Sequence, residues 1–210
     1  MGALLPVNRP RLVRRSQALS YLTLGYNSLE GLIALGAGAV AGSIALVGFG
    51  IDSLIELVAG GTALWRLSAD ADPVRRAQVE HRAHRLVGLC FLLLAAYVGF
   101  EAVIALAAES APSQSWVGIA LAALSLVVMP LLARAKRGIA IKLNSGALVA
   151  EATQTLVCTY LSAILLGGLL LNAVAGWWWA DPVAALAMTP LLVWEGIEGV
   201  RGRSVCGDGC

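Results

Sequence analysis

Residues 43–65 read SIALVGFGIDSLIELVAGGTALW and combine a long apolar run with two acidic residues. A run of this length is sufficient for a helix that crosses a bilayer, for which about 20 apolar residues are needed. It lacks the period-two alternation of a transmembrane β-strand. Asp52 and Glu56 lie one helical turn apart within it, and carboxylates in hydrocarbon are costly enough to make each a functional candidate. The stretch therefore predicts a membrane-spanning helix that carries part of a functional site.

Five further apolar segments flank this one, separated by helix breakers or charged residues. They cover roughly residues 17–40, 86–107, 116–133, 145–171 and 181–199. Hydrophobic residues make up 59% of the chain and charged residues only 13%, with a mean hydropathy of +0.79, whereas soluble domains carry about 25% charged residues. This composition argues against soluble enzymes and nucleic-acid-binding domains. We expect one all-α integral membrane domain over residues 1–210 with six transmembrane helices.

The basic residues all fall on one side of the six segments. All 15 Lys and Arg precede the first segment, follow the last, or lie in the connections 66–85 and 134–144. Because cytoplasmic loops are enriched in Lys and Arg, this asymmetry predicts that both termini are cytoplasmic. The run Trp177–Trp179 fits the opposite interface, where indole rings prefer to lie. No Lys or Arg lies within a predicted segment, so no basic side chain is expected to neutralise the acids there.

Polar residues recur at helical spacing within the predicted spans. One continuous stripe along residues 145–171 consists of Glu151, Gln154, Thr155, Cys158 and Ser162. The acids of the spans must be protonated, hydrated or paired with a cation that is not part of the chain. Asp52 and Glu56 from one helix, with Gln154 and Cys158 from another, can supply four donors around a small ion. Such a set with a thiolate favours zinc or cadmium over magnesium or calcium.

Several of these residues have a structural role as an alternative. Cys158 can equally be a small buried apolar residue, and the neutral amide of Gln154 is a weak zinc ligand. Glu30 and Glu101 can be protonated partners in interhelical hydrogen bonds. The candidates for a proton or ion pathway are Asn27, Glu30, Glu101 and Asp181.

Two pairs of residues outside the spans are candidates for accessory metal ligands. His81 and His84, in the connection after residues 43–65, can chelate a metal, although solvated histidines are the commoner case. Cys206 and Cys210 end the sequence as Cys-Gly-Asp-Gly-Cys. On the cytoplasmic side these thiols stay reduced and can capture metal, unless they are idle in a frayed tail. The sequence has no Walker loop, HExxH or Ser/His/Asp arrangement, so no enzymatic activity is expected.

Three motifs resemble those of the cation diffusion facilitator family. Residues 42–46, GSIAL, and 52–56, DSLIE, together resemble the family pattern GS-x-AL…(H/D)-S-L-x-D. Residues 145–158, SGALVAEATQTLVC, are similar to S-x-AL-x-ADA-x-H-x-x-x-D. Residues 181–186, DPVAAL, are similar to DP-I-x-AL. The motifs occur in the family's order, and the resemblance covers roughly residues 17–203.

The resemblance implies a homodimeric secondary transporter in the plasma (inner) membrane that exports a divalent metal from the cytoplasm in exchange for protons. Zinc is the first expected substrate and cadmium or cobalt the next, without a tightly bound cofactor. The family's tetrahedral site maps onto Asp52, Glu56, Gln154 and Cys158. Gln154 and Cys158 stand where the family has His and Asp, and Glu151 is an alternative fourth ligand.

Three further expectations accompany this resemblance. Because the sequence ends at residue 210, the family's cytoplasmic metal-sensing domain is expected to be missing. One alternative function is a metal-binding or regulatory membrane protein that transports nothing. The other is a proton-coupled exporter of organic cations, for which carboxylates alone suffice.

Overall fold

The computed structural model describes residues 9–68, 73–143 and 146–201, and these residues form six helices without any strand. The helices are α1 (Arg9–Ala41), α2 (Ile44–Ser68), α3 (Pro73–Ala107), α4 (Trp116–Leu143), α5 (Gly146–Ala175) and α6 (Ala180–Arg201). Each contains one of the six predicted apolar segments or nearly all of it. The predicted all-α class and the number of helices are confirmed.

Five of the six helices are long and apolar enough to cross a membrane by length and composition. The qualifying stretches are Ile44–Gly61, Arg85–Ala107, Trp116–Leu143, Glu151–Ala175 and Ala180–Arg201. Helix α1 is long enough, but Asn27, Ser28 and Glu30 lower its hydropathy. Asn27 and Glu30 are buried among the other helices, whereas Leu29 and Leu32 are exposed on the outer face. The chain is therefore a multi-pass membrane protein in which α1 turns its polar residues inward.

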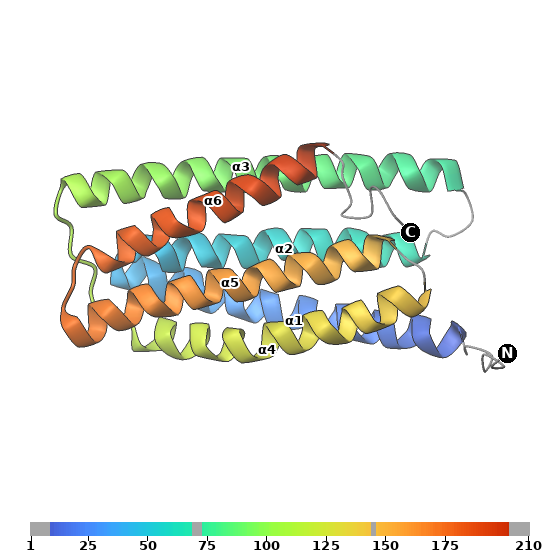
Figure 1. Cartoon of the computed structure of the whole chain (residues 1–210), viewed down its shortest axis with the longest axis horizontal. Helices are drawn as coiled ribbons and strands as arrows, with labels where there is room; N and C mark the ends of the chain where they lie inside the picture. Colours follow the sequence, from blue (N-terminus) through green and yellow to red (C-terminus); the bar gives the residue numbers. More distant parts are fainter. Residues whose placement is uncertain (1–8, 69–72, 144–145, 202–210) are drawn as a thin grey trace, which may run out of the picture.

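The helices run up and down along the long axis of the molecule (Figure 1). Helix α3 packs chiefly against α6, α4 against α5, and α1 against α2. Helix α2 contacts α1, α3, α5 and α6 and so lies at the junction of the bundle. Buried apolar side chains, including Phe49, Val98, Leu161 and Met188, fill the interior between these helices. This central position of α2 places its two acids within reach of several helices at once.

Small residues let α3 and α6 approach closely. A Cβ added at Gly88 would lie 2.5 Å from the backbone nitrogen of Val200 and 2.7 Å from the carbonyl oxygen of Gly196. Helix pairs in membranes commonly use such small residues to bring their backbones together. Gly88 and Gly196 therefore determine where α3 and α6 cross.

The turn between α1 and α2 is held in place by α6. Gly42, with φ of +67°, adopts the left-handed conformation that glycine accepts without strain and ends α1. The Ser43 hydroxyl accepts a hydrogen bond from the backbone N–H of Leu46 at 3.1 Å and donates one to Asp181. Asp181 also accepts from the backbone N–H of Ile44 at 2.9 Å. Asp181 therefore caps α2 from the first turn of α6.

The first turn of α1, the last turns of α2 and α4 and the first turns of α3 and α5 lie toward one end of the bundle, and α6 ends on the same side (Figure 1). Exposed basic side chains gather on the helix segments of this end, among them Arg11, Arg14, Arg137, Lys142 and Arg201. The distribution matches the charge asymmetry of the sequence. Its orientation in a membrane stays a prediction.

Helix α4 extends well beyond the predicted segment 116–133 and carries a buried base. The apolar run ends there, but helical spacing of inward positions continues through Ala133, Lys136 and Ala140, all of which are buried. Lys136 is only 5% exposed. The expectation that no Lys or Arg lies within a span is therefore wrong for Lys136.

The connection after α2 is shorter than predicted. Helix α3 begins at Pro73, a residue type favoured in the first helical turn, and its backbone includes His81 and His84. The two histidines thus lie on a helix and not in a loop. Their side chains lie outside the part of the chain that the structure describes.

Candidate functional site

The four predicted ligands lie on two helices that pack against each other, α2 and α5. Asp52 and Glu56 are one turn apart on α2, and Gln154 and Cys158 are one turn apart on α5. The exposed fractions are 2% for Asp52, 6% for Glu56 and 1% for Cys158. Gln154 is partly buried. Two carboxyl groups and a thiol therefore share the interior between these helices.

Asp52 lies at the centre of this group of side chains. Its carboxyl group lies beside the Cys158 thiol, and it also interacts with the carboxyl groups of Glu30 and Glu195. Asp52 Oδ2 is buried and has no hydrogen-bond partner among the described residues. A buried oxygen of this kind is rare in folded proteins, because the lost hydration is not replaced. The position suits a proton or a cation.

Helix α1 supplies hydrogen-bond partners to the acids. Asn27 Nδ2 donates to Glu56 Oε2 at 2.7 Å. Ser53 Oγ of α2 donates to Glu30 Oε2 of α1 at 3.1 Å. The other amide atom of Asn27, the acceptor Oδ1, is buried and lacks a partner in the described part of the chain. Helix α1 thus belongs to the site as much as α2 and α5.

In this conformation the donors are not gathered around a single point. Among the described side chains, no three His, Cys, Asp or Glu residues are arranged closely enough to hold a metal ion. Glu56 is engaged by Asn27, and Glu30 by Ser53. Binding a metal at Asp52 and Glu56 would require exchanging such hydrogen bonds for metal ligation.

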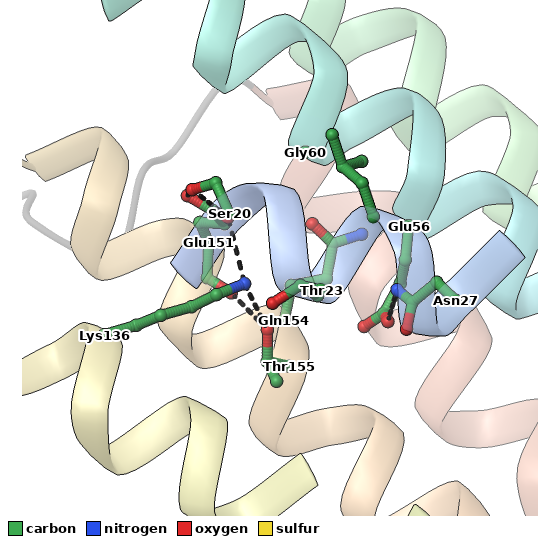
Figure 2. A pocket seen from close by; sticks show the side chains of 10 residues that line it. Ser20, Thr23, Asn27, Glu56, Gly60, Lys136, Glu151, Gln154 and Thr155 are labelled. Atoms are coloured by element: carbon green, nitrogen blue, oxygen red, sulfur yellow. Dashed lines mark hydrogen bonds and ion pairs between the residues drawn. The ribbon is translucent and has the colours of Figure 1, made fainter. Parts of the chain in front are cut away.

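A small cavity adjoins Glu56 between α1, α2, α4 and α5 (Figure 2). Its volume of about 10 Å³ suits a single water-sized guest. Polar side chains that line it include Thr23, Asn27, Glu56, Lys136, Glu151 and Gln154. The Gln154 Nε2 atom is buried and has no hydrogen-bond partner within residues 9–68, 73–143 and 146–201. The cavity therefore offers both donors and acceptors.

A buried ion pair forms part of the cavity wall. Lys136 Nζ lies 2.9 Å from Glu151 Oε1, with exposed fractions of 5% and 9% for the two side chains. The same ammonium group donates to Thr155 Oγ1 at 3.3 Å. Ser20 Oγ contacts both carboxylate oxygens of Glu151, at 3.0 and 3.3 Å. Glu151 therefore has a cation of its own within the protein (Figure 2).

The remaining candidates lie apart from this group. Asp181 caps α2 at its first residues, away from Glu56 in the middle of that helix. Glu101 is partly buried on α3 and is not among the described groups that interact with Asp52 or Glu56. Four predicted accessory ligands have side chains outside the described part of the structure: His81, His84, Cys206 and Cys210.

The sequence analysis named neither Lys136 nor Glu195 as a site candidate. Glu195 lies within the predicted span 181–199, where an acid carries the same cost in hydrocarbon as the acids on the other spans. Glu195 could therefore have been named as a candidate from the sequence alone. Lys136 lies beyond the predicted end of its span at residue 133, and only the continued helical spacing of inward positions pointed to it.

Comparisons with known proteins identify the family of this chain. Residues 21–201 match the family of the cation efflux transmembrane domain, a range that includes the four predicted ligands Asp52, Glu56, Gln154 and Cys158. A protein of Synechocystis sp., named an uncharacterized transporter, is 29% identical over 198 residues. That match covers 90% of this chain and 63% of the relative, so the chain spans less than two thirds of the relative's length. The chain belongs to the cation efflux family, the cation diffusion facilitators.

Proposed function

We propose that the protein is a secondary active transporter that exports a divalent transition-metal cation from the cytoplasm in exchange for protons. Zinc is the first expected substrate, followed by cadmium or cobalt. Membership of the cation efflux family supports cation transport. The observation that carries the choice of metal is the buried group formed by Asp52, Glu56 and Cys158. Carboxylate oxygens combined with a thiolate favour zinc or cadmium over magnesium or calcium.

In this proposal, metal and protons compete for the same oxygens. Asp52 and Glu56 lose protons when they take the metal on the cytoplasmic side. They are protonated again on the opposite side, where the metal leaves. Because ligand deprotonation accompanies metal binding, the two fluxes are coupled in opposite directions. Glu56 exchanges its hydrogen bond with Asn27 for the metal during loading.

Gln154 is the fourth ligand in this proposal, through its amide oxygen. It lies one turn from Cys158 on α5 and lines the cavity beside Glu56. Glu151, the alternative, is already neutralised by Lys136 at 2.9 Å. A carboxylate that has a protein cation gains less from a metal than one that has none.

In this conformation the cavity beside Glu56 has a volume of about 10 Å³, enough for a guest of the size of one water molecule. An organic cation would fit there only after the helices move apart. The alternative of a metal-binding protein that does not transport is separated by flux measurements. We also propose cytoplasmic termini, residence in the plasma (inner) membrane and a homodimer formed through the helices.

Zinc flux into liposomes tests the function and the site together. The purified protein is reconstituted into liposomes that contain a zinc-sensitive dye. It should move zinc into the liposomes when a proton gradient drives protons out. Asp52→Asn removes a carboxylate of the site and should reduce zinc-coupled proton flux to background. Glu109→Gln is a matched control, because it removes one exposed acid outside the helices.

Three outcomes would contradict parts of this proposal. Wild-type flux in Asp52→Asn would refute the site. Zinc binding without flux in the wild type would favour the non-transporting alternative. Flux of organic cations without zinc flux would favour the exporter of organic cations.

A further inference from the structure

We propose that Lys136 is a resident counter-cation of the transport site, a fixed positive charge that weakens metal binding and thereby speeds metal release. The inference rests on the proposed function and adds a residue that sets affinity without being a ligand. It starts from the position of Lys136 in the fold.

Lys136 is held inside the bundle and not in the solvated end of α4. Its side chain is 5% exposed, and Nζ contacts Glu151 Oε1 at 2.9 Å and Thr155 Oγ1 at 3.3 Å. Lys is almost never buried unless it is paired. Both contacts belong to α5, so this ammonium group is fixed against the helix that carries Gln154 and Cys158.

Lys136 shares the small cavity with Glu56 of α2. Lys136 and Glu56 both line it, together with Asn27 and Gln154 (Figure 2). Lys136 and Asp52 are both close enough to Glu56 for their charges to act on it, and the two act with opposite sign. Lys136 therefore lines one cavity with both its own partner, Glu151, and a proposed metal ligand, Glu56.

A fixed positive charge at this place opposes a second cation. Charges interact more strongly in a protein interior than in water, because the effective dielectric constant is lower. A divalent ion bound to Glu56 is therefore repelled by Lys136. A transport site must bind its ion strongly enough to load and weakly enough to release it. By lowering the affinity of the site for the metal, Lys136 favours release of the ion over its retention.

Zinc binding by charge variants of Lys136 tests the inference. Lys136→Met keeps most of the length of the side chain and removes the charge. The zinc dissociation constant should fall about tenfold, equivalent to about 1.4 kcal/mol. The maximal flux in liposomes should fall as well, because release becomes slow. Lys136→Arg keeps the charge and should bind zinc like the wild type. Lys142→Met removes an exposed charge from the last turn of the same helix and should change neither quantity.

The double variant Lys136→Met/Glu151→Gln covers the case in which the single variant fails to fold. Removing one partner of a buried ion pair leaves an uncompensated charge, whereas removing both partners does not. The double variant removes the positive charge that opposes the metal together with its partner, so it should still bind zinc more tightly than the wild type, by less than Lys136→Met does.

Each result decides between the two proposals. An unchanged or higher dissociation constant in folded Lys136→Met or in the double variant overturns the inference. Tighter binding in Lys136→Arg also overturns it, because charge would then not be the cause. If Asp52→Asn loses zinc binding while Lys136→Met binds like the wild type, this inference fails and the proposed function stands. A wild-type protein that binds no divalent cation overturns both.

Discussion

Among the described residues, more acidic than basic side chains are buried in the interior of this protein. Glu30, Asp52 and Glu56 are all buried, with exposed fractions of 1%, 2% and 6%. The buried base of the described chain, Lys136, is bonded to a different acid, Glu151. Three carboxyl groups are thus left to hydrogen-bond donors, protons or external cations. An excess of buried acid is costly to stability, and such residues in membrane spans commonly serve ion or proton transport.

Cys158→Ser tests the role of the thiol in metal preference. A thiolate prefers soft metals, so replacing sulfur by oxygen should weaken cadmium binding by roughly tenfold or more and change manganese binding little. Titration of the purified protein with both metals measures the two dissociation constants. Cys90→Ser, at a partly buried position on α3, is the matched control. Equal behaviour of both variants with cadmium would leave Cys158 as a buried apolar residue without a role in binding.

Individual helices show why apolar runs predicted the spans but not their ends. A window of hydropathy averages over all sides of a helix, whereas helix α4 continues as long as one side faces the interior. That side continues through Ala133, Lys136 and Ala140. The apolar run ends before Lys136, and a basic residue at the edge of a run is more commonly solvated. The prediction therefore placed Lys136 in a connection.

Gly88→Ala tests the close crossing of α3 and α6. The added Cβ would lie 2.5 Å from the backbone nitrogen of Val200, so one of the helices must shift. Overpacking of this kind costs about 1–3 kcal/mol. The measurement is thermal unfolding of the purified protein in detergent.

Gly99→Ala provides the control on the same helix. A Cβ at Gly99 would meet the nearest atom, on Thr189, at an ordinary 3.6 Å. This change should stabilise α3 by about 0.5–1 kcal/mol through helix propensity. Equal unfolding temperatures for the two variants would show that Gly88 does not determine the crossing.

Asp181→Ala tests whether Asp181 serves the fold or the ion pathway. The carboxylate caps α2 by accepting from Ser43 and from the N–H of Ile44. Loss of a cap costs about 0.5–2 kcal/mol. We therefore expect a lower unfolding temperature and an unchanged zinc flux per folded molecule, with Asp181→Asn intermediate in stability. Loss of zinc flux at an unchanged unfolding temperature would instead show that Asp181 is part of the ion pathway.

For the molecule as a whole, contacts between helices were the part that the sequence could not predict. Periodicity places Asp52 and Glu56 on one side of α2, because that depends only on spacing within one helix. Periodicity does not predict that Asn27 of α1 donates a hydrogen bond to Glu56, or that the carboxyl group of Glu195 on α6 interacts with that of Asp52. Such pairs depend on how the helices are rotated and shifted against one another. The metal ligands were therefore predicted on α2 and α5, and Asn27 and Glu30 of α1 only as pathway candidates. Their hydrogen bonds to α2 were found only in the fold.

The orientation of the whole molecule in the membrane follows from its charge distribution and can be measured by cysteine labelling. The α3–α4 connection lies at the end of the bundle opposite Lys142, and basic ends face the cytoplasm. In intact cells, a membrane-impermeant maleimide should label Ser110→Cys and leave Lys142→Cys unlabelled. Both positions are exposed, so accessibility within the protein is comparable. Mass spectrometry separates the introduced cysteines from the native ones, and permeabilised cells should label both variants. Labelling of Lys142→Cys alone in intact cells would invert the orientation, and metal would then enter the site from outside.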